Sequence, residues 1–393
     1  MKKIAILGST GSIGTSTLSI VEQFSDRYEV VSLAAGQNID TTFEQCVRWR
    51  PKLVSLATEE LAGELQRRLV ATSIAPGAIE VVWGSAGSVT AATLPEVDFV
   101  VSAIVGVAGL EATYAAACAG KDIGLANKES MVAAGELVIE AVRKSGSALL
   151  PIDSEHNAVH QCMRGGTANE VKQIWLTASG GPFRSTPKVD FATITPSQAL
   201  KHPTWVMGQR ITIDSATMMN KGFEVIEACR LFDLPASKVR VTVHPQSTVH
   251  SLVEYVDGSI LAQLSVTDMR LPILYALAYP ERVESDLTFD MEKLSYLNFS
   301  PPDFDRFPCL RLAYEAAEAG GTAGVALNAA DEIAVAAFLA GEIPFMGIPR
   351  TIEQVLAATP VTRPCSIQEV LAADEAARAQ AREIIAQGVV ARV

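Results

Sequence analysis

The sequence lacks an excess of positive charge. Its 32 lysines and arginines are outnumbered by 44 aspartates and glutamates, which gives a formal net charge of -12. An acidic surface gains nothing from releasing the counterions of nucleic acid or of an anionic membrane, so we expect neither as a partner. Any anionic ligand must be held by local groups.

The sequence also lacks paired cysteines and long hydrophobic runs. Its six cysteines are widely scattered, with no CxxC pair and no zinc-type spacing, which predicts reduced thiols and a cytoplasmic location. The apolar run after Met1 is only a few residues long, too short for a signal peptide or a membrane span. We expect it to form a first strand. There is no internal repeat and no low-complexity tract.

What the sequence has is apolar content and a strand-helix alternation. At 393 residues, 49% hydrophobic and 19% charged, it predicts a globular chain of two or three domains. An α/β fold with an N-terminal Rossmann-like, doubly wound sheet is predicted, because buried-strand patterns alternate with helical ones. The predicted strands are 3–8, 29–36, 52–58, 79–84, 97–106, 121–129 and 148–155, and the predicted helices are 15–24, 42–49, 60–70, 110–120 and 135–146.

A glycine-rich loop, "GSTGSIG" at 8–14, joins the first predicted strand to the first helix. Such a loop lets the backbone approach a pyrophosphate, while the helix N-terminus offers free N–H groups. The spacing differs from G-x-G-x-x-G, but the strand-loop-helix context predicts dinucleotide binding. The second strand ends at Gln37 and Asn38, which carry no negative charge and favour NADP. No basic residue lies beside them, and Asp40 could reverse the preference.

Carboxylates suggest a metal site. Asp153 and Glu155 are two residues apart and point the same way if the preceding strand continues. Two such carboxylates repel unless a cation lies between them or one is protonated. Glu224, expected in the first turn of its helix, is the third candidate, and oxygen ligands favour Mg²⁺ or Mn²⁺ over Zn²⁺. Spacing alone leaves open that Glu224 merely stabilises a helix N-terminus.

The middle of the chain predicts an α+β domain. All five histidines lie between 156 and 250, although a capping or core role remains open for each of them. Ser179 with Gly180 and Gly181 predicts an anion nest after a strand. Asp257-Gly258 predicts a hairpin between two alternating strands. Residues 286–311 are expected to be a linker, and 312–393 a small helical domain that includes a capping box at Ser366 and Glu369.

Eight segments together resemble the 1-deoxy-D-xylulose 5-phosphate reductoisomerase family. They occur in the family's order along the whole chain: "GSTGSIG", "AAGQN", "LANKES", "PIDSEH", "SGGPFR", "HPTWVMG", "DSATMMNKGFEVIEA" and "VHPQSTVHS". The resemblance implies an NADPH-binding domain at 1–150 and a catalytic domain that binds metal and substrate at 151–285. It also implies a homodimer, so we expect two copies of the chain to assemble.

The resemblance further implies roles for single residues. The cation, Mg²⁺ or Mn²⁺ with Co²⁺ as a further option, would be held by Asp153, Glu155 and Glu224. Catalytic roles would fall to Lys128, Glu155 and His202. The substrate would contact these three and also Ser154, Ser179, Trp205, Ser215, Asn220, Lys221 and Glu224. NADPH would contact Thr10, Gly11, Ser12, Ile13, Gly36, Gln37, Asn38, Asn127, Glu129 and Gly208. Relatives often carry a basic residue where Gln37 stands.

The implied reaction is a retro-aldol and aldol rearrangement of 1-deoxy-D-xylulose 5-phosphate, followed by hydride transfer from NADPH, which gives 2-C-methyl-D-erythritol 4-phosphate. The loop "HPTWVMG" at 202–208 would close as a flap over the substrate. Two other functions remain open. One is an NADP-dependent dehydrogenase of another phosphorylated sugar, which leaves the three carboxylates without a purpose. The other is a non-catalytic NADP-binding regulator, which needs neither metal nor flap.

Overall fold

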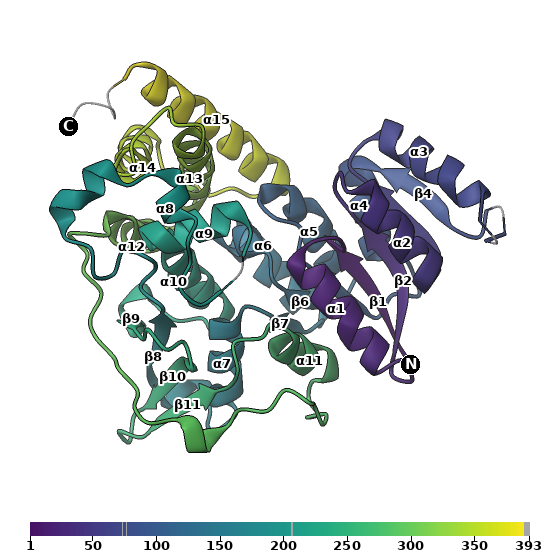
Figure 1. Ribbon diagram of the computed structural model, residues 1–393, viewed down its shortest axis with the longest axis horizontal. Helices are drawn as coiled ribbons and strands as arrows, with labels where there is room; N and C mark the ends of the chain where they lie inside the picture. The colour runs from purple at the N-terminus through teal and green to yellow at the C-terminus, as the bar shows by residue number, and fades with distance from the viewer. Residues whose placement is uncertain (73, 76, 206, 389–393) are drawn as a thin grey trace. The chain divides into compact units, whose positions relative to one another are not determined.

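The structure is a computed structural model that describes residues 1–72, 74–75, 77–205 and 207–388. Contacts divide the chain into two compact units (Figure 1). Unit 1 comprises Met1–Ser130, Glu136–Asn157 and Asp268–Leu287, and unit 2 comprises Met131–Gly135, Ala158–Thr267 and Thr288–Val393. Within the described ranges, no helix is long and apolar enough to cross a membrane.

Unit 1 is built on a seven-stranded parallel sheet in the order β4-β3-β2-β1-β5-β6-β7. The strand order reverses between β1 and β5, so right-handed crossovers place helices on both faces. The strands are β1 Lys2–Leu7, β2 Tyr28–Ala34, β3 Leu53–Leu56, β4 Glu80–Trp83, β5 Phe99–Ser102, β6 Asp122–Leu125 and β7 Leu149–Pro151. This confirms the predicted Rossmann-like sheet and each of its seven strands.

Helices connect these strands and close the core of unit 1. They are α1 Ser12–Gln23, α2 Ile39–Trp49, α3 Glu59–Val70, α4 Gly84–Thr93, α5 Leu110–Cys118, α6 Lys128–Ser145 and α11 Arg270–Ala278, with the short η1 Val107–Gly109 before α5. Leu18 of α1, Leu65 of α3 and Ile273 of α11 lie in one buried cluster with the strand side chains. Helix α6 is interrupted at Ala134, whose backbone is not helical.

Unit 2 contains a four-stranded mixed sheet in the order β11-β10-β8-β9. Strands β8 Val171–Ala178 and β9 Val239–Val243 are parallel, whereas β10 Val249–Tyr255 pairs antiparallel with both β8 and β11 Ile260–Leu264. Gly258, in the predicted hairpin turn, has a positive φ of 88°, a conformation that glycine adopts without steric cost. The predicted antiparallel component is therefore confirmed.

Helices make up the rest of unit 2. They are α7 Ser154–Met163, shared with unit 1, α8 Pro196–Ala199, α9 Gln209–Thr217, α10 Met219–Leu231, α12 Pro308–Ala319, α13 Ala323–Leu339, α14 Gly347–Ala358 and α15 Ile367–Ala386. Short 3-10 turns are η2 Ala168–Glu170, η3 Lys188–Thr193, η4 Ala236–Lys238 and η5 Met291–Lys293. Most of 286–311 lacks regular structure, although α12 begins at Pro308, inside the range expected to be a linker.

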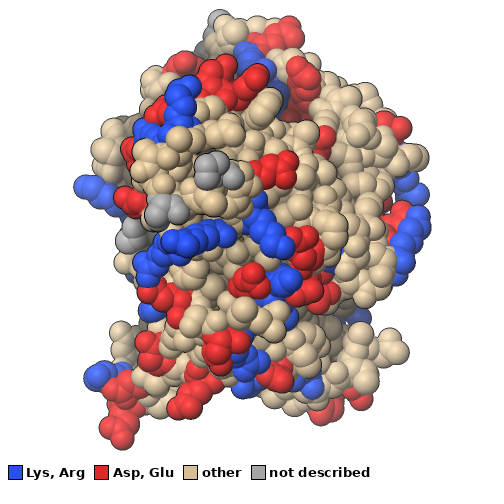
Figure 2. Space-filling view, turned by 90° about the vertical axis from the view of Figure 1, so that its right-hand side faces the viewer, with Lys and Arg blue, Asp and Glu red and all other residues tan. Residues whose placement is uncertain are grey.

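The surface carries both signs of charge. On the face drawn in Figure 2, lysines and arginines are interspersed with aspartates and glutamates over a largely neutral surface. Ion pairs such as Arg48 with Glu22 and Lys144 with Glu140 join side chains that are mostly exposed. Exposed pairs of this kind contribute little to stability, so the fold depends on its apolar cores.

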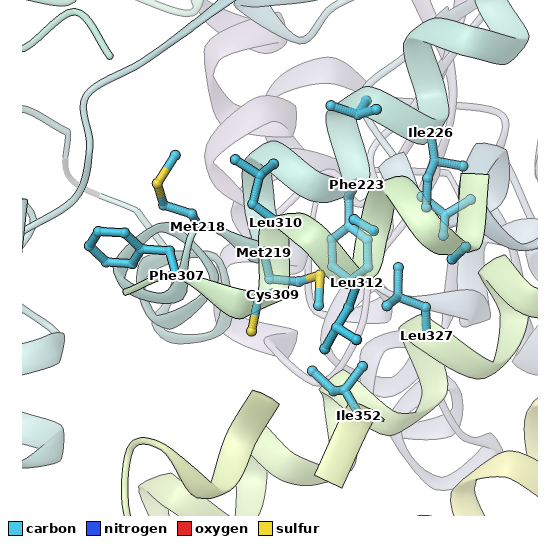
Figure 3. Packing of buried hydrophobic residues seen from close by; sticks show 14 of the residues in the cluster. Met218, Met219, Phe223, Ile226, Phe307, Cys309, Leu310, Leu312, Leu327 and Ile352 are labelled. Carbon is cyan, nitrogen blue, oxygen red and sulfur yellow. The ribbon is translucent and has the colours of Figure 1, made fainter. Parts of the chain in front are cut away.

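The C-terminal helices share their core with α10. Figure 3 shows Phe223 and Ile226 of α10 beside Leu310 and Leu312 of α12, with Leu327 of α13 and Ile352 of α14 close by. All of these side chains are buried. The burial of large apolar side chains contributes about 1.5–3 kcal/mol each. This shared core holds α10, which carries several predicted site residues, in a fixed place within unit 2.

Candidate active site

The glycine loop lies at the point where the strand order of the sheet reverses. Gly8 has a φ of 87°, and a Cβ there would come within 2.4 Å of the Ala103 carbonyl oxygen after β5. A Cβ on Gly14 would meet the Gly8 oxygen at 2.3 Å. Only glycine therefore permits this close approach of loop, strand and helix. Helix α1 begins at Ser12, and its N-cap Gly11 makes no side-chain cap, so Thr10, Gly11, Ser12 and Ile13 form a loop suited to a pyrophosphate.

The loop after β2 is exposed. Gly36, Gln37 and Asn38 are all exposed, and the Asn38 side chain caps α2 by accepting the Thr41 N–H at 3.1 Å. The Ala57 N–H donates to the Gly36 oxygen at 3.2 Å, which joins this loop to the one that follows β3. Both loops stand at the carboxyl edge of the sheet, where an adenosine ribose is bound in folds of this kind.

Asn127 and Glu129 lie at the start of α6. The Asn127 side chain caps α6 by accepting the Ser130 N–H at 2.9 Å, and its amide donates to the Ile104 and Gly106 oxygens at 2.5 and 2.9 Å. It also donates to Glu129 at 3.0 Å. Protein atoms therefore engage both ends of the Asn127 side chain, and its backbone N–H donates to the Ser102 oxygen at 3.0 Å. Gly208, the other distant cofactor candidate, is the exposed N-cap of α9.

Asp153 and Glu155 lie at the junction of β7 and α7. The premise that the strand continues through them is wrong, because β7 ends at Pro151 and α7 begins at Ser154. The Asp153 carbonyl accepts the Asn157 N–H at 2.8 Å, so Asp153 occupies the N-cap position. Even so, oxygens of Asp153 and Glu155 lie within 4.8 Å of each other. The Ser154 hydroxyl donates to Glu155 at 2.5 Å.

Lys128 forms an ion pair with Asp153, and both side chains are nearly buried. Burial acts to raise the pKa of Asp153, but the Lys128 ammonium and His156 outweigh it and hold this pKa well below its usual range. The carboxylate thus stays ionised at neutral pH, as a cation ligand must. Sequence reasoning gave no role to His156, whose Nδ1 lies 3.5 Å from Asp153 Oδ2. The sequence signal that could have identified it was its position three residues after Asp153, at the start of a helix.

Glu224 lies in the second turn of α10, because this helix begins at Met219. The expectation of a first-turn position is therefore wrong, and simple stabilisation of the helix N-terminus is a poor explanation for a carboxylate that is 0% exposed. Asn220 donates to Glu224 Oε1 at 2.7 Å, and the Lys221 ammonium pairs with Oε2. A buried carboxylate held in this way is oriented and charged.

The chain turns sharply between α9 and α10. Met218, between the two helices, has a φ of 63°, which brings the last turn of α9, with Ser215, against the first turn of α10, with Asn220 and Lys221. Gly181 packs onto the same corner, because a Cβ there would lie 2.6 Å from the Ser215 oxygen. Three residues predicted to contact the substrate, Ser215, Asn220 and Lys221, and the Ser179 loop therefore lie on one local framework in unit 2.

Ser179 and His202 contact each other. His202 Nδ1 accepts the N–H groups of Trp205 at 2.9 Å and Thr204 at 3.2 Å, so we assign the ring proton to Nε2. Nε2 then donates to Ser179 Oγ, 3.1 Å away, and this oxygen also accepts the Gly181 N–H at 3.2 Å. The Ser179 hydroxyl proton remains to be donated to a ligand oxygen. Trp205 is half-buried, and Val206 of the loop lies outside the described residues.

Comparison with known proteins gives a match along the chain. A family model described as 1-deoxy-D-xylulose 5-phosphate reductoisomerase matches residues 4–135, and models of the family's C-terminal parts match 149–232 and 264–380. The reductoisomerase of Solibacter usitatus is 53% identical over 98% of this chain and 97% of its own. The chain belongs to the 1-deoxy-D-xylulose 5-phosphate reductoisomerase family.

Solved structures of 1-deoxy-D-xylulose 5-phosphate reductoisomerases have the same fold. The Zymomonas mobilis enzyme in complex with NADPH is 45% identical, with a TM-score of 0.91 over 98% of this chain and 99% of that one. A second reductoisomerase, in complex with NADPH, fosmidomycin and magnesium, is 42% identical, with a TM-score of 0.92 over 98% of each chain. The resemblance stated from eight sequence segments is confirmed.

Proposed function

We propose that this chain catalyses the metal- and NADPH-dependent rearrangement and reduction of 1-deoxy-D-xylulose 5-phosphate to 2-C-methyl-D-erythritol 4-phosphate, a step of isoprenoid precursor biosynthesis. The full-length match to a reductoisomerase structure that holds NADPH, fosmidomycin and magnesium carries this conclusion. When bound, the cation would polarise substrate oxygens as a Lewis acid and NADPH would supply the hydride. The chain's own residues bind, orient and shield the reacting groups.

Unit 1 would supply all the predicted NADPH contacts except Gly208, which belongs to unit 2. The glycine loop would receive the pyrophosphate on the N-terminus of α1, since the loop leaves no room for side chains at Gly8 and Gly14. Gly36, Gln37 and Asn38 would contact the adenosine end, while Asn127, Glu129 and Gly208 would contact the remainder of the cofactor. These contacts remain predictions.

Asp153, Glu155 and Glu224 would hold the divalent cation. All three offer carboxylate oxygens, the ligands that Mg²⁺ and Mn²⁺ prefer. The low pKa of Asp153 and the two partners of Glu224 support charged ligands at neutral pH. Co²⁺ is a further option for the same donor set.

The substrate phosphate would be bound by Ser179, Ser215, Asn220 and Lys221. The support is their common framework at the α9–α10 corner, together with a hydroxyl proton of Ser179 that His202 leaves free to donate. Trp205, tied to His202 through its backbone N–H, would cover the substrate chain. Closure of this loop over a bound phosphate would exclude water from the reaction.

Proton transfer would fall to Lys128 and Glu155. Lys128 pairs with Asp153, and Glu155 accepts a hydrogen bond from Ser154, so both are oriented by neighbours in unit 1. Proton transfer by a positioned side chain typically contributes about 10²–10⁴-fold to a rate. Ser154 would contact a substrate hydroxyl.

We also propose a homodimer located in the cytoplasm. Strand β11 is an edge strand of its sheet, and its Ile260 and Leu261 are 54% and 40% exposed. An exposed apolar edge strand can pair with another chain. We likewise propose a division by function into domains at 1–150, 151–285 and 312–393, with 286–311 as a linker. In packing, however, 312–388 is not separate, because it shares a compact unit and a core with the middle of the chain.

Incubation of the purified protein with 1-deoxy-D-xylulose 5-phosphate, NADPH and Mg²⁺ tests the proposed function. We expect oxidation of NADPH, a branched product identified by NMR, and loss of activity in EDTA that excess Mg²⁺ restores. An unbranched product would indicate the dehydrogenase of another phosphorylated sugar instead. Turnover that EDTA leaves unchanged would contradict the role of the three carboxylates.

A further inference from the structure

The loop after β2 poses an electrostatic problem for NADPH. A 2'-phosphate is normally bound by a nearby arginine, yet Gln37 and Asn38 are neutral. Asp40 follows in the first turn of α2 and is 80% exposed at its side chain. A lone carboxylate at this place accepts a ribose 2'-hydroxyl and repels a 2'-phosphate, so it would select NADH.

Arg68, which lies on another helix, can compensate for the charge of Asp40. It lies in the last turn of α3, and its Nη1 donates to Asp40 Oδ1 at 2.5 Å. Side chains on a helix lean toward its N-terminus, which for α3 is the edge of the sheet where the Gly36 loop stands. The hydrogen bond from the Ala57 N–H to the Gly36 oxygen, 3.2 Å long, joins the start of α3 to that loop. Asp40 follows Asn38 by two residues, so its hydrogen bond places the Arg68 guanidinium near the loop predicted to bind the adenosine end of the cofactor.

The charge and the remaining donors of Arg68 suit a phosphate. Its hydrogen bonds to Asp40 and Glu64 use two of its five N–H groups. Hydrogen bonds to Asp40 and Glu64 raise the pKa of Arg68, so it stays charged. Exposed ion pairs contribute little to stability. A phosphate can therefore take up remaining donors, or replace one carboxylate, at little cost.

We propose that Arg68 determines the preference for NADPH over NADH: it offsets the Asp40 carboxylate and donates to the adenosine 2'-phosphate, in place of a basic residue at position 37. This inference rests on the proposed use of NADPH. Arg68 of α3 and Asp40 of α2 thus together determine which of the two cofactors the site prefers. Arg67, on the same turn of α3 and exposed, makes no hydrogen bond to Asp40 among the described residues.

Equilibrium binding of adenine nucleotides tests this proposal without any sugar phosphate, so its outcome is independent of the reaction. In calorimetry, Arg68→Gln should weaken 2',5'-ADP by about 10- to 100-fold, the cost of losing a charged hydrogen-bond donor. It should leave 5'-AMP, which lacks the 2'-phosphate, nearly unchanged. Arg67→Gln, which removes the same charge one residue away, should change the affinity for each nucleotide by less than about threefold.

A double variant distinguishes two effects of losing Arg68: repulsion of the 2'-phosphate by Asp40, and loss of a hydrogen-bond donor to that phosphate. If Arg68 offsets Asp40, Asp40→Asn added to Arg68→Gln should recover part of the lost 2',5'-ADP affinity, and the NADPH-to-NADH affinity ratio should rise with it. Equal loss of both mononucleotides in Arg68→Gln would overturn the proposal. So would unchanged 2',5'-ADP binding, or a loss in Arg67→Gln as large as that in Arg68→Gln. Circular dichroism confirms that each variant is folded.

Discussion

At the scale of single residues, the protonation of His202 governs the loop that follows it. Neutral Nδ1 accepts two backbone N–H groups, and Nε2–H donates to Ser179. Burial lowers the pKa of His202 from its usual 6.5, so the folded loop binds fewer protons than the unfolded chain. The stabilisation of this loop by the neutral His202 ring is therefore present at neutral pH. It is lost as pH falls below about 6.5 toward the lowered pKa.

His202→Asn tests this assignment. An asparagine oxygen can replace Nδ1 as the acceptor of the Thr204 and Trp205 N–H groups but cannot reach Ser179. We expect KM for the phosphorylated substrate to rise by about 10-fold, the value of one hydrogen bond to a charged or buried group. In the parent, protonation of His202 should raise KM as the pH falls below 6.5. We expect this rise to be absent in the variant when KM is measured from pH 5.5 to 8. A variant that keeps the parent's pH profile would exclude His202 as the titrating group.

The sequence predicts some residues of the site better than others. Asp153 and Glu155 could be proposed because neighbouring carboxylates repel each other unless a cation lies between them or one is protonated. Glu224 joined them as a ligand through the resemblance to the family, since spacing alone left a helix-stabilising role open. Their local geometry could not be predicted, since neither the end of β7 at Pro151 nor the start of α10 at Met219 has a strong signal. Arg68 lies 28 residues from Asp40, so no local pattern could join the two.

At the scale of secondary-structure elements, a charged network joins α9 to the C-terminal helices of unit 2. Arg210 of α9 donates to Glu332 and Asn328 of α13, each at 2.9 Å. Arg378 of α15 donates to Glu332 at 2.7 Å. Because α9 carries Ser215, this network fixes one side of the proposed phosphate site to the helices beyond the linker.

Asp331 is the fully buried carboxyl of this network. It faces Asp214 and Arg210 of α9 and lies near Glu332 and Cys309. Burial raises the pKa of Asp331 from 3.8 to about 6, against the opposing effect of Arg210. The folded state therefore binds the proton more tightly than the unfolded chain. The associated stability is fully present below about pH 4 and is lost as pH rises through about 6.

Asp331→Asn keeps a neutral side chain at every pH and should remove this dependence. We expect the melting temperature of the variant, relative to the parent, to increase between pH 4.5 and 7.5. The full free-energy change is on the order of 3 kcal/mol, at roughly 1.4 kcal/mol per pKa unit, and on the order of 2 kcal/mol of it falls between pH 4.5 and 7.5. Differential scanning fluorimetry measures it, with the exposed Asp190→Asn as the control whose offset from the parent should stay constant. A constant offset for Asp331→Asn as well would show that Asp331 does not titrate in this range.

Elements differ in how well the sequence predicts them. Six of the seven strands of unit 1 are largely buried apolar runs, and α12 to α15 are rich in buried apolar residues, so their patterns were sufficient. The edge strand β4 has no buried residue and was predicted from its short apolar run alone. Helix α4, Gly84–Thr93, was missed because its sequence, GSAGSVTAAT, is made almost entirely of small residues and has no apolar stripe. It forms because small residues permit close packing: a Cβ on Gly87 would lie 2.6 Å from Ser55 Oγ of β3. That requirement belongs to the tertiary structure.

At the scale of the whole molecule, an acidic chain binds two anionic ligands through local groups. With a net charge of -12, long-range attraction cannot supply the affinity. The glycine loop and Arg68 would serve NADPH, while Ser179, Lys221 and the α9–α10 corner would serve the sugar phosphate. The cation on Asp153, Glu155 and Glu224 is the central claim, because it separates a reductoisomerase from a simple dehydrogenase.

Binding of Mn²⁺ to Glu224→Gln, followed by electron paramagnetic resonance, tests that claim most directly. The substitution keeps the shape of the side chain and an acceptor for Asn220 but removes the charge, so we predict Mn²⁺ affinity to fall on the order of 100-fold. NADPH affinity should stay within about twofold of the parent's. Glu254→Gln, a carboxylate of β10 that pairs with Lys172, is the matched control and should bind Mn²⁺ as the parent does. Unchanged Mn²⁺ binding in Glu224→Gln, or a collapse of NADPH binding, would contradict the account.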